Sequence, residues 1–238
     1  FLLFNITEEG PKKGEDLQEI LVPDDRQPGW RTRSFIHKYD LATGVFQRLT
    51  YGHTSTSIND ISDDGRYLLF TCSERELTKR PFSTTLLYRM DLQTLDTELL
   101  LKDPFISYAQ FSPDGKKLAF IEEGERLMVM DVKSKAVTQV TDGSQWFGTE
   151  GSFNYNWSPD SKWFCLEFIG NGRDPYSDIG IVSVNGGKIT NITNSAYINV
   201  LPRWVLDGGA IMFISNRYGL RSQASWGSQD DVLLAFVN

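Results

Sequence analysis

Two histidines and many serines are the residues of this chain that could perform hydrolytic chemistry. A serine nucleophile needs a histidine base within hydrogen-bonding reach and an acid that orients the base. His37 falls in a strand-like run, and His53 follows Gly52 in a connecting segment. The Gly-x-Ser-x-Gly pattern of a nucleophile elbow does not occur, since Gly227-Ser228 is followed by Gln229. The sequence therefore predicts no catalytic residue within this chain.

Paired acids are the groups that could bind a metal ion: Asp24-Asp25, Asp63-Asp64 and Asp230-Asp231. A calcium loop supplies several oxygen ligands at alternating positions, and no such run occurs here. Cys72 and Cys165 have no metal-ligand spacing. We therefore predict neither a metal nor a cofactor.

The excess of acidic over basic side chains argues against some classes of partner. The 238 residues carry 31 acidic and 24 basic side chains, with a formal net charge of -7. Phosphate groups are bound by clustered Lys and Arg, so this balance argues against nucleic acid and an anionic membrane surface as partners. No apolar run reaches the roughly 18 residues of a membrane span. A hydrophobic content of 40% predicts a folded core.

The elements that must position any site come from a repeated turn. Its four copies are Ser62-Asp63-Asp64-Gly65, Ser112-Pro113-Asp114-Gly115, Ser158-Pro159-Asp160-Ser161 and Val205-Leu206-Asp207-Gly208. The third positions are residues 64, 114, 160 and 207, so the steps are 50, 46 and 47 residues. Proline at the second position and glycine at the fourth suit a type I turn. An apolar residue precedes each turn: Ile61, Phe111, Trp157 and Trp204. We expect Phe111, Trp157 and Trp204 to be buried between adjacent sheets.

Strands follow each turn. Two apolar columns lie two residues apart: Leu68, Leu118, Phe164 and Ile211, then Phe70, Phe120, Leu166 and Phe213. The residues between them are also apolar, so we expect this second strand to be buried on both faces. A third strand ends in a turn at Asp40, Asp91, Asp131 or Ser183. A fourth strand closes three units with Leu49-Thr50, Val140-Thr141 and Ile192-Thr193.

Four antiparallel strands per unit of about 40 to 50 residues are typical of propeller blades. The sequence predicts an all-β fold, a β-propeller with approximate blades at 1–52, 58–103, 107–143, 153–194 and 199–238. The first blade enters at its second strand and the last ends with its third, which gives three full and two partial blades. Open sheet edges favour aggregation. We therefore expect residues 1–238 to be one incomplete propeller region, cut from a ring of six or seven blades.

The remaining distinctive residues have structural explanations. Cys72 and Cys165 fall in second strands two units apart, too distant for a disulfide, so we expect two free thiols and a core position for Cys165. Trp146 lies between blades and is interpreted as a loop anchor rather than as part of a binding face. Insertions at Gly10–Arg33 and Ser73–Ser83 join second to third strands and project from one face. We interpret each as a solvated hairpin tip rather than a binding loop.

The turn and its flanks resemble the propeller repeats of TolB-like proteins and tricorn-type serine peptidases over the whole chain. A more specific string spans Ser215–Ser228, with Ala224-Ser225-Trp226-Gly227-Ser228 and then Asp231-Val232. It is similar to the segment that closes the first propeller of bacterial tricorn-like peptidases. This resemblance implies a non-catalytic propeller that gates or orients peptides for a serine-peptidase region outside this chain.

Two alternatives remain: a TolB-like protein-interaction propeller, and the propeller of a prolyl-oligopeptidase-type hydrolase. The resemblance implies peptides or unfolded polypeptide, other domains of the same polypeptide, and further copies of the chain as partners. It also implies export, for example to the periplasm, with a cytoplasmic location as the alternative.

The resemblance implies that a basic pair on the first propeller of tricorn-like peptidases holds a substrate carboxylate. The adjacent Lys79 and Arg80, on a projecting insertion, are candidates for substrate binding here. Lys12-Lys13 and Lys116-Lys117 are the other adjacent basic pairs considered, and the last pair sits at a turn where solvated lysine is expected.

Overall fold

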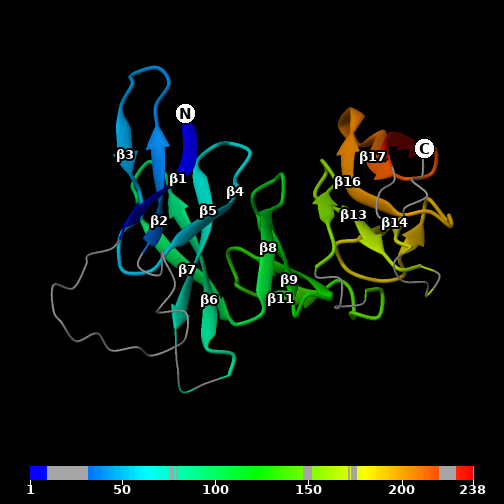
Figure 1. Cartoon of the computed structure of the whole chain (residues 1–238), viewed down its shortest axis with the longest axis horizontal. Coiled ribbons are helices and arrows are strands. Elements are labelled where there is room, and N and C mark those ends of the chain that lie inside the picture. Colours follow the sequence, from blue (N-terminus) through cyan, green and yellow to red (C-terminus); the bar gives the residue numbers. More distant parts are fainter. Residues whose placement is uncertain are drawn as a thin grey trace. The chain divides into compact units, whose positions relative to one another are not determined.

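The structure is a computed structural model that describes residues 1–9, 32–75, 78, 80–146, 152–170, 172, 176–219 and 229–237. Within these ranges the regular elements are strands β1 to β18 and one short 3-10 turn, η3 (Leu206–Gly208). The strands form five antiparallel sheets (Figure 1). The chain divides into two compact units, Phe1–Asp60 with Gly65–Pro104, and Ile61–Asp64 with Phe105–Asn238.

Two sheets belong to the first unit. The first sheet has the order β1-β2-β3, with β1 at Leu2–Glu9, β2 at Thr32–Tyr39 and β3 at Phe46–Arg48. The second has the order β4-β5-β6-β7, with β4 at Thr56–Ile61, β5 at Tyr67–Arg75, β6 at Ser83–Asp91 and β7 at Thr97–Asp103. In the first sheet β2 is the central strand, between β1 and β3.

Three sheets belong to the second unit. The third sheet contains β8 (Ile106–Phe111), β9 (Lys117–Glu122), β10 (Arg126–Asp131) and β11 (Val137–Gln139). The fourth contains β12 (Tyr155–Trp157), β13 (Trp163–Phe168), β14 (Asp178–Ser183) and β15 (Thr190–Asn191). The fifth contains β16 (Asn199–Val205), β17 (Ala210–Ser215) and β18 (Asp231–Phe236). Within the described residues this unit contains two four-stranded sheets and one three-stranded sheet, and the division into full and partial blades stays a prediction.

The second strands form the core. Both predicted columns are buried, from Leu68 to Ile211 and from Phe70 to Phe213. The intervening position is also buried in three sheets, at Leu69, Ala119 and Cys165, but Met212 is only partly buried. Met212 lies opposite Leu234, which is 51% exposed, because that face of the fifth sheet is uncovered within the described residues.

The aromatic residues before the turns follow the prediction in two of three cases. Phe111 and Trp157 are buried. The prediction is wrong for Trp204, which is only partly buried because it lines an open pocket of about 390 Å³ that also contacts Trp163 and Val237.

A hydrogen bond from the serine hydroxyl to the aspartate carboxylate stabilises the repeated turn in three of its copies. In the third sheet, the Ser112 hydroxyl donates to the Asp114 carboxylate at 2.7 Å and accepts the Lys117 N–H at 2.9 Å. Equivalent hydroxyl-to-carboxylate bonds occur at the other two serine copies. The fourth copy starts with Val205, which has no hydroxyl, and its backbone instead forms η3 with Asp207 at φ +51°. The four copies are therefore not the same turn.

A threonine follows the last strand of three sheets. The Thr50 hydroxyl accepts the Ile36 N–H at 2.8 Å, Thr141 accepts that of Leu127 at 2.9 Å, and Thr193 accepts that of Ile179 at 3.0 Å. Each amide lies on the strand that pairs with the last strand of its sheet, namely β2, β10 or β14. Because a buried N–H needs an acceptor, the recurrent threonine has a hydrogen-bonding role as well as a packing one.

Candidate functional site: the first-strand bulges of the second unit

The first strands of two sheets in the second unit contain a bulge. In β8 the pairing with β9 shifts between Ser107 and Gln110, and in β16 the pairing with β17 shifts between Val200 and Arg203. Each bulge inserts a large side chain followed by a small buried one: Tyr108 then Ala109, and Leu201 then Pro202. In a propeller the first strand of each blade borders the central channel. Bulges at such an edge redirect a side chain.

Tyr108 and Leu201 occupy equivalent places in their repeats, three residues before the apolar residue that precedes the turn. Tyr108 is 56% exposed and Leu201 is 46% exposed. Asn154 holds the same place in the fourth sheet. The three first strands are neighbours, because the Trp204 N–H donates to Asn156 Oδ1 at 3.1 Å and the Tyr155 hydroxyl reaches β8. We call Tyr108, Asn154 and Leu201 the bulge row.

Both exposed members of the bulge row have left-handed backbones, with φ +51° at Tyr108 and φ +55° at Leu201. A residue with a Cβ in this region costs roughly 1 kcal/mol relative to ordinary backbone. Such conformations persist where surrounding structure fixes them. Two buried polar side chains of the fourth sheet do so here.

Tyr155 fixes the first bulge. Its ring is 5% exposed, and its hydroxyl donates to the carbonyl of Tyr108 and lies 3.0 Å from that of Ala119. The ring also packs edge-on against Phe164 at 5.7 Å. The hydroxyl therefore connects the fourth sheet to the third at the bulge.

Glu167 fixes the second bulge. Its carboxylate accepts the Leu201 N–H at 2.6 Å, the Asn154 N–H at 3.0 Å and the Asn154 side-chain amide at 2.9 Å. The side chain is only 3% exposed, and no lysine or arginine pairs with it among the described residues. Burial raises the pKa of Glu167, opposed by these hydrogen bonds.

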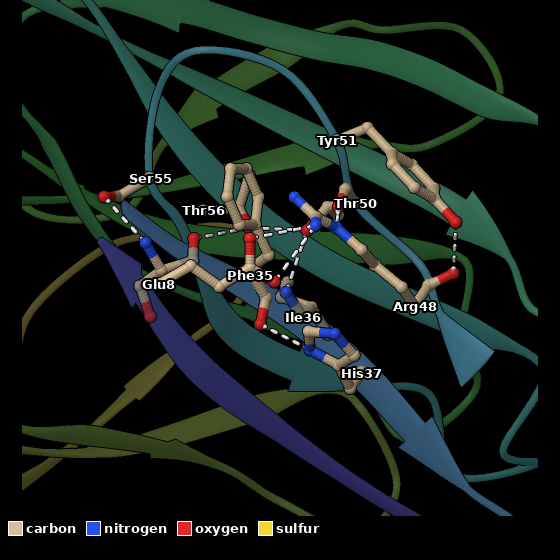
Figure 2. Close-up of polar contacts among 10 residues, drawn as sticks. Glu8, Phe35, Ile36, His37, Arg48, Thr50, Tyr51, Ser55 and Thr56 are labelled. Atoms are coloured by element: carbon tan, nitrogen blue, oxygen red, sulfur yellow. Dashed lines mark hydrogen bonds and ion pairs between the residues drawn. The ribbon is translucent and has the colours of Figure 1, made fainter. Parts of the chain in front are cut away.

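Both histidines lie in described parts of the first unit. His37 is buried, and its Nδ1 donates to the Phe35 carbonyl (Figure 2) at 3.0 Å. Its ring stacks 5.0 Å from that of Phe46. The neighbouring Arg48 stacks 3.9 Å over Phe35 and pairs with Glu8 at 3.0 Å. His37 thus packs within the first sheet. His53 lies in a connecting segment, and its backbone carbonyl accepts the Arg33 side chain at 2.7 Å.

Only one residue of the predicted basic pair, Arg80, is among the described residues. Lys79 lies outside the described residues, as do Lys12 and Lys13. Arg80 is exposed, and its guanidinium lies 3.9 Å from the ring centroid of Phe82. Lys116 is also exposed and lies 3.6 Å from Asp114 within its own turn. The assignment of Lys79 and Arg80 to substrate binding stays a prediction.

The second insertion is shorter than predicted. Strand β5 continues to Arg75 and pairs there with Ser83, so part of the second insertion is a regular hairpin. Most of the first insertion and the string at 220–228 lie outside the described residues. Trp146 is partly buried, with its ring 5.8 Å from that of Phe153, which confirms its interpretation as an anchor.

Both cysteines are free thiols, as predicted. Cys165 is fully buried, and burial raises the pKa of its thiol to about 12. The described residues contain no group of three His, Cys, Asp or Glu side chains that could hold a metal ion. The acid pair Asp24-Asp25 is not among them. In the same part of the chain, no helix has the length and hydropathy to cross a membrane.

Comparison with known proteins identifies the fold type. Residues 62–170 match the family model of the dipeptidyl peptidase IV (DPP IV) N-terminal region. The crystal structure of the tricorn protease superposes with a TM-score of 0.61 at 15% identity, over 86% of this chain and 20% of that one. The β-propeller domain of the Trilobed protease from Pyrococcus furiosus gives 0.58 at 14% identity, over 88% and 63%. The fold is a β-propeller.

TolB proteins are similar in both sequence and structure. TolB of Wolinella succinogenes is 25% identical over 192 residues, which is 78% of this chain and 42% of that protein. An uncharacterized protein of Agrobacterium fabrum is 25% identical over 171 residues, or 71% and 55%. The crystal structure of TolB from Acinetobacter baumannii gives a TM-score of 0.56 at 22% identity, over 84% and 46%. The chain spans about half the length of these curated relatives.

The sequence patterns did not reveal the bulge row or the two side chains that fix it, Tyr155 and Glu167. Glu167 was nevertheless marked by its position, because the same column holds Ile121 in the third sheet and Ile214 in the fifth. An acid in a strand predicted to be buried on both faces needs hydrogen-bond donors. A charged residue in this column was therefore the signal that could have identified Glu167.

Proposed function

We propose that this chain is the non-catalytic propeller portion of a tricorn-like serine peptidase. In this role it gates or orients peptides for a catalytic region outside the chain. The observation that carries the proposal is the match of residues 62–170 to the N-terminal region of a peptidase family. The propeller resemblance to the tricorn and Trilobed proteases supports it, as does the similarity of the 215–228 string to tricorn-like peptidases. The finer assignment to the tricorn type rests on that string.

The partners proposed with this function are peptides or unfolded polypeptide, the remaining domains of the same polypeptide, and other copies of the chain. Export to the periplasm is proposed from the family resemblance, with the cytoplasm as the alternative. Serine-peptidase activity is proposed for the parent protein and not for residues 1–238.

The substrate-binding part of the proposal is tested at Arg80. Arg80 is exposed and its guanidinium lies over the ring of Phe82, and a guanidinium can bind a carboxylate through two N–H groups. Charge reversal, Arg80→Glu, in the parent peptidase is expected to raise KM for short peptides with a free carboxyl end. Lys116→Glu, an exposed basic residue at a turn, is the matched control. Unchanged peptide kinetics for Arg80→Glu would remove Arg80 from the proposal.

The non-catalytic part is tested with residues 1–238 alone. Peptide hydrolysis needs an activated nucleophile, a base and an oxyanion site, and the described histidines provide none of these partnerships. Fluorogenic peptides should therefore be cleaved by the parent protein and not by this chain. Turnover by the chain that is lost on replacing His37 or His53 would contradict the proposal.

A TolB-like protein-interaction propeller is the second candidate, favoured by 25% identity to TolB over 192 residues. A parent protein without peptidase activity that still binds a protein partner through this chain would support it. A prolyl-oligopeptidase-type parent is distinguished by a nucleophile elbow in an accompanying α/β-hydrolase region.

A further inference from the structure

An open pocket of about 390 Å³ lies between the fourth and fifth sheets, beside the third and fourth copies of the repeated turn. Its lining includes two indoles, two aliphatic side chains and two carboxylates: Trp163, Trp204, Ile181, Val237, Asp160 and Asp207. A pocket of this size can hold a small organic molecule. We call it the turn pocket.

The repeat by itself does not require a pocket at this place. Ile181, Trp204 and Val237 are each only partly buried. The residues that hold the same positions between the third and fourth sheets are all buried: Val129, Trp157 and Val184. The turn pocket is therefore a property of this one boundary and not of every boundary between sheets.

The fourth position of the turn differs between the two boundaries. The Ser161 hydroxyl accepts the Asp114 N–H at 3.1 Å and so joins the third turn copy to the second. The fourth copy has Gly208 at this position, and glycine has no side chain that could reach the third copy in the same way. The two turns are nevertheless neighbours, because a Cβ on Gly208 would lie 3.7 Å from Pro159 Cδ. They adjoin without a bridging side chain, which leaves the pocket open.

The lining combines aromatic faces with negative charge. Trp163 is 45% exposed, and the same position in the third sheet is Lys117, so the repeat does not demand an aromatic residue there. The face of an indole attracts a cation. Asp160 and Asp207 add two carboxylates, and none of the described residues that line the pocket is basic. This combination favours a ligand with positive charge and apolar surface.

Asp160 is held in its charged form. The Ser158 hydroxyl donates to Asp160 Oδ1 at 2.6 Å, and this hydrogen bond lowers the pKa of the carboxyl group. The Lys162 ammonium lies 3.8 Å from Asp160 Oδ2, and both side chains are largely exposed. Exposed ion pairs are weak, so another cation can compete with Lys162 for this carboxylate.

We infer that the turn pocket binds a small organic cation, an ammonium group that carries an apolar body. The indoles and aliphatic side chains contact the apolar surface of the ligand, and the two carboxylates balance its charge. No group of three His, Cys, Asp or Glu side chains among the described residues could hold a metal ion, so an organic cation fits better than a metal. The inference goes beyond the proposed handling of peptides and does not depend on it.

The test is a titration of the 238-residue chain with choline, followed by the indole N–H signals of its six tryptophans in ¹H–¹⁵N spectra. Choline should shift the signals of Trp163 and Trp204, which are assigned from variants that lack each indole. The control ligand is 3,3-dimethylbutan-1-ol, which has the shape of choline without its charge. It should bind at least about tenfold more weakly, because it lacks the attraction to the indoles and carboxylates.

Four variants examine the charges of the site. Asp160→Asn and Asp207→Asn should each weaken choline binding by about fivefold, as expected for one charge removed near the protein surface, and leave binding of the alcohol unchanged. Lys162→Met removes the competing ammonium and should tighten choline binding by a similar factor. Asp114→Asn is the matched control, because Asp114 has the same place and the same serine partner in the second turn copy but does not line the pocket.

Equal affinity for choline and the neutral alcohol, or binding of neither, would overturn the inference. It would also be overturned if Asp114→Asn weakened choline binding as much as Asp160→Asn, or if Lys162→Met did not tighten it. Lys162 is exposed, so its replacement keeps the test decisive even if Asp160→Asn fails to fold. A parallel titration with Nα-acetyl-lysine methylamide distinguishes a free cation from a lysine side chain. Choline should bind more tightly, and tighter binding of the lysine derivative would overturn the assignment to a free cation.

Discussion

Replacing Glu167 by glutamine should change how stability depends on pH. Burial holds the folded-state pKa of Glu167 above its ordinary value of 4.5, despite three N–H donors. Between the two values the native state binds more protons than the unfolded chain, so stability falls as pH rises. The slope reaches about 1.4 kcal/mol per pH unit. Glu167→Gln has no proton to exchange at this position and should lose this component.

The quantity to measure is the free energy of unfolding of wild type minus that of Glu167→Gln. Urea titrations followed by tryptophan fluorescence at a series of pH values give this difference. It should be largest below pH 4.5 and fall as pH rises above that value, by about 1.4 kcal/mol in total for each unit by which the folded pKa exceeds the unfolded one. Asp207→Asn, at an exposed acid of the same unit, corrects for the loss of one negative charge. A difference that is constant or grows with pH would refute the reasoning about desolvation.

Three further predictions follow from packing and hydrogen bonding. Thr141→Val leaves the buried Leu127 N–H without its 2.9 Å acceptor and should lower the free energy of unfolding by about 1–3 kcal/mol in urea titrations; no change would refute the strand-closing role. In Gly180→Ala the added methyl would lie 2.4 Å from Ile189 Cγ2, so we expect about 1–3 kcal/mol of destabilisation, and a wild-type urea midpoint would contradict that packing. Cys165 is fully buried with its pKa raised to about 12, so one of the two thiols should resist an aromatic disulfide reagent until denaturant is added. Rapid labelling of both in the native protein would contradict its burial.

Local pattern was sufficient for the blade. Alternating apolar residues in the second strands predicted burial on both faces because side chains of a strand point alternately to its two sides. The aspartates that end the third strands predicted turns because their carboxylates accept nearby backbone N–H groups. Asp131 does this for Lys133 and Ser134 at 3.1 and 2.7 Å. These interactions span only a few residues, so the sequence contains the information for them.

Predictions from the local sequence pattern were wrong where the conformation depended on one side-chain group or on the surroundings of one residue. The fourth turn copy carries the expected aspartate and glycine, yet Val205 removes the serine hydroxyl that clasps the other three. Trp204 matches Trp157 in the repeat, but the pocket beside it leaves it partly exposed. An alignment of the repeats assigns the same environment to equivalent positions, but the residues that surround those positions differ from one sheet to the next.

The sequence by itself determined the all-β class, the four-stranded unit and the placement of the core columns. Only the tertiary structure decided where the bulge row lies and what fixes it. Glu167 and Leu201 are separated by 34 residues, and Tyr155 and Tyr108 by 47, so no local pattern relates them. Their hydrogen bonds exist because neighbouring sheets bring the first strands together, and a buried donor or acceptor must then find its partner across the blade boundary.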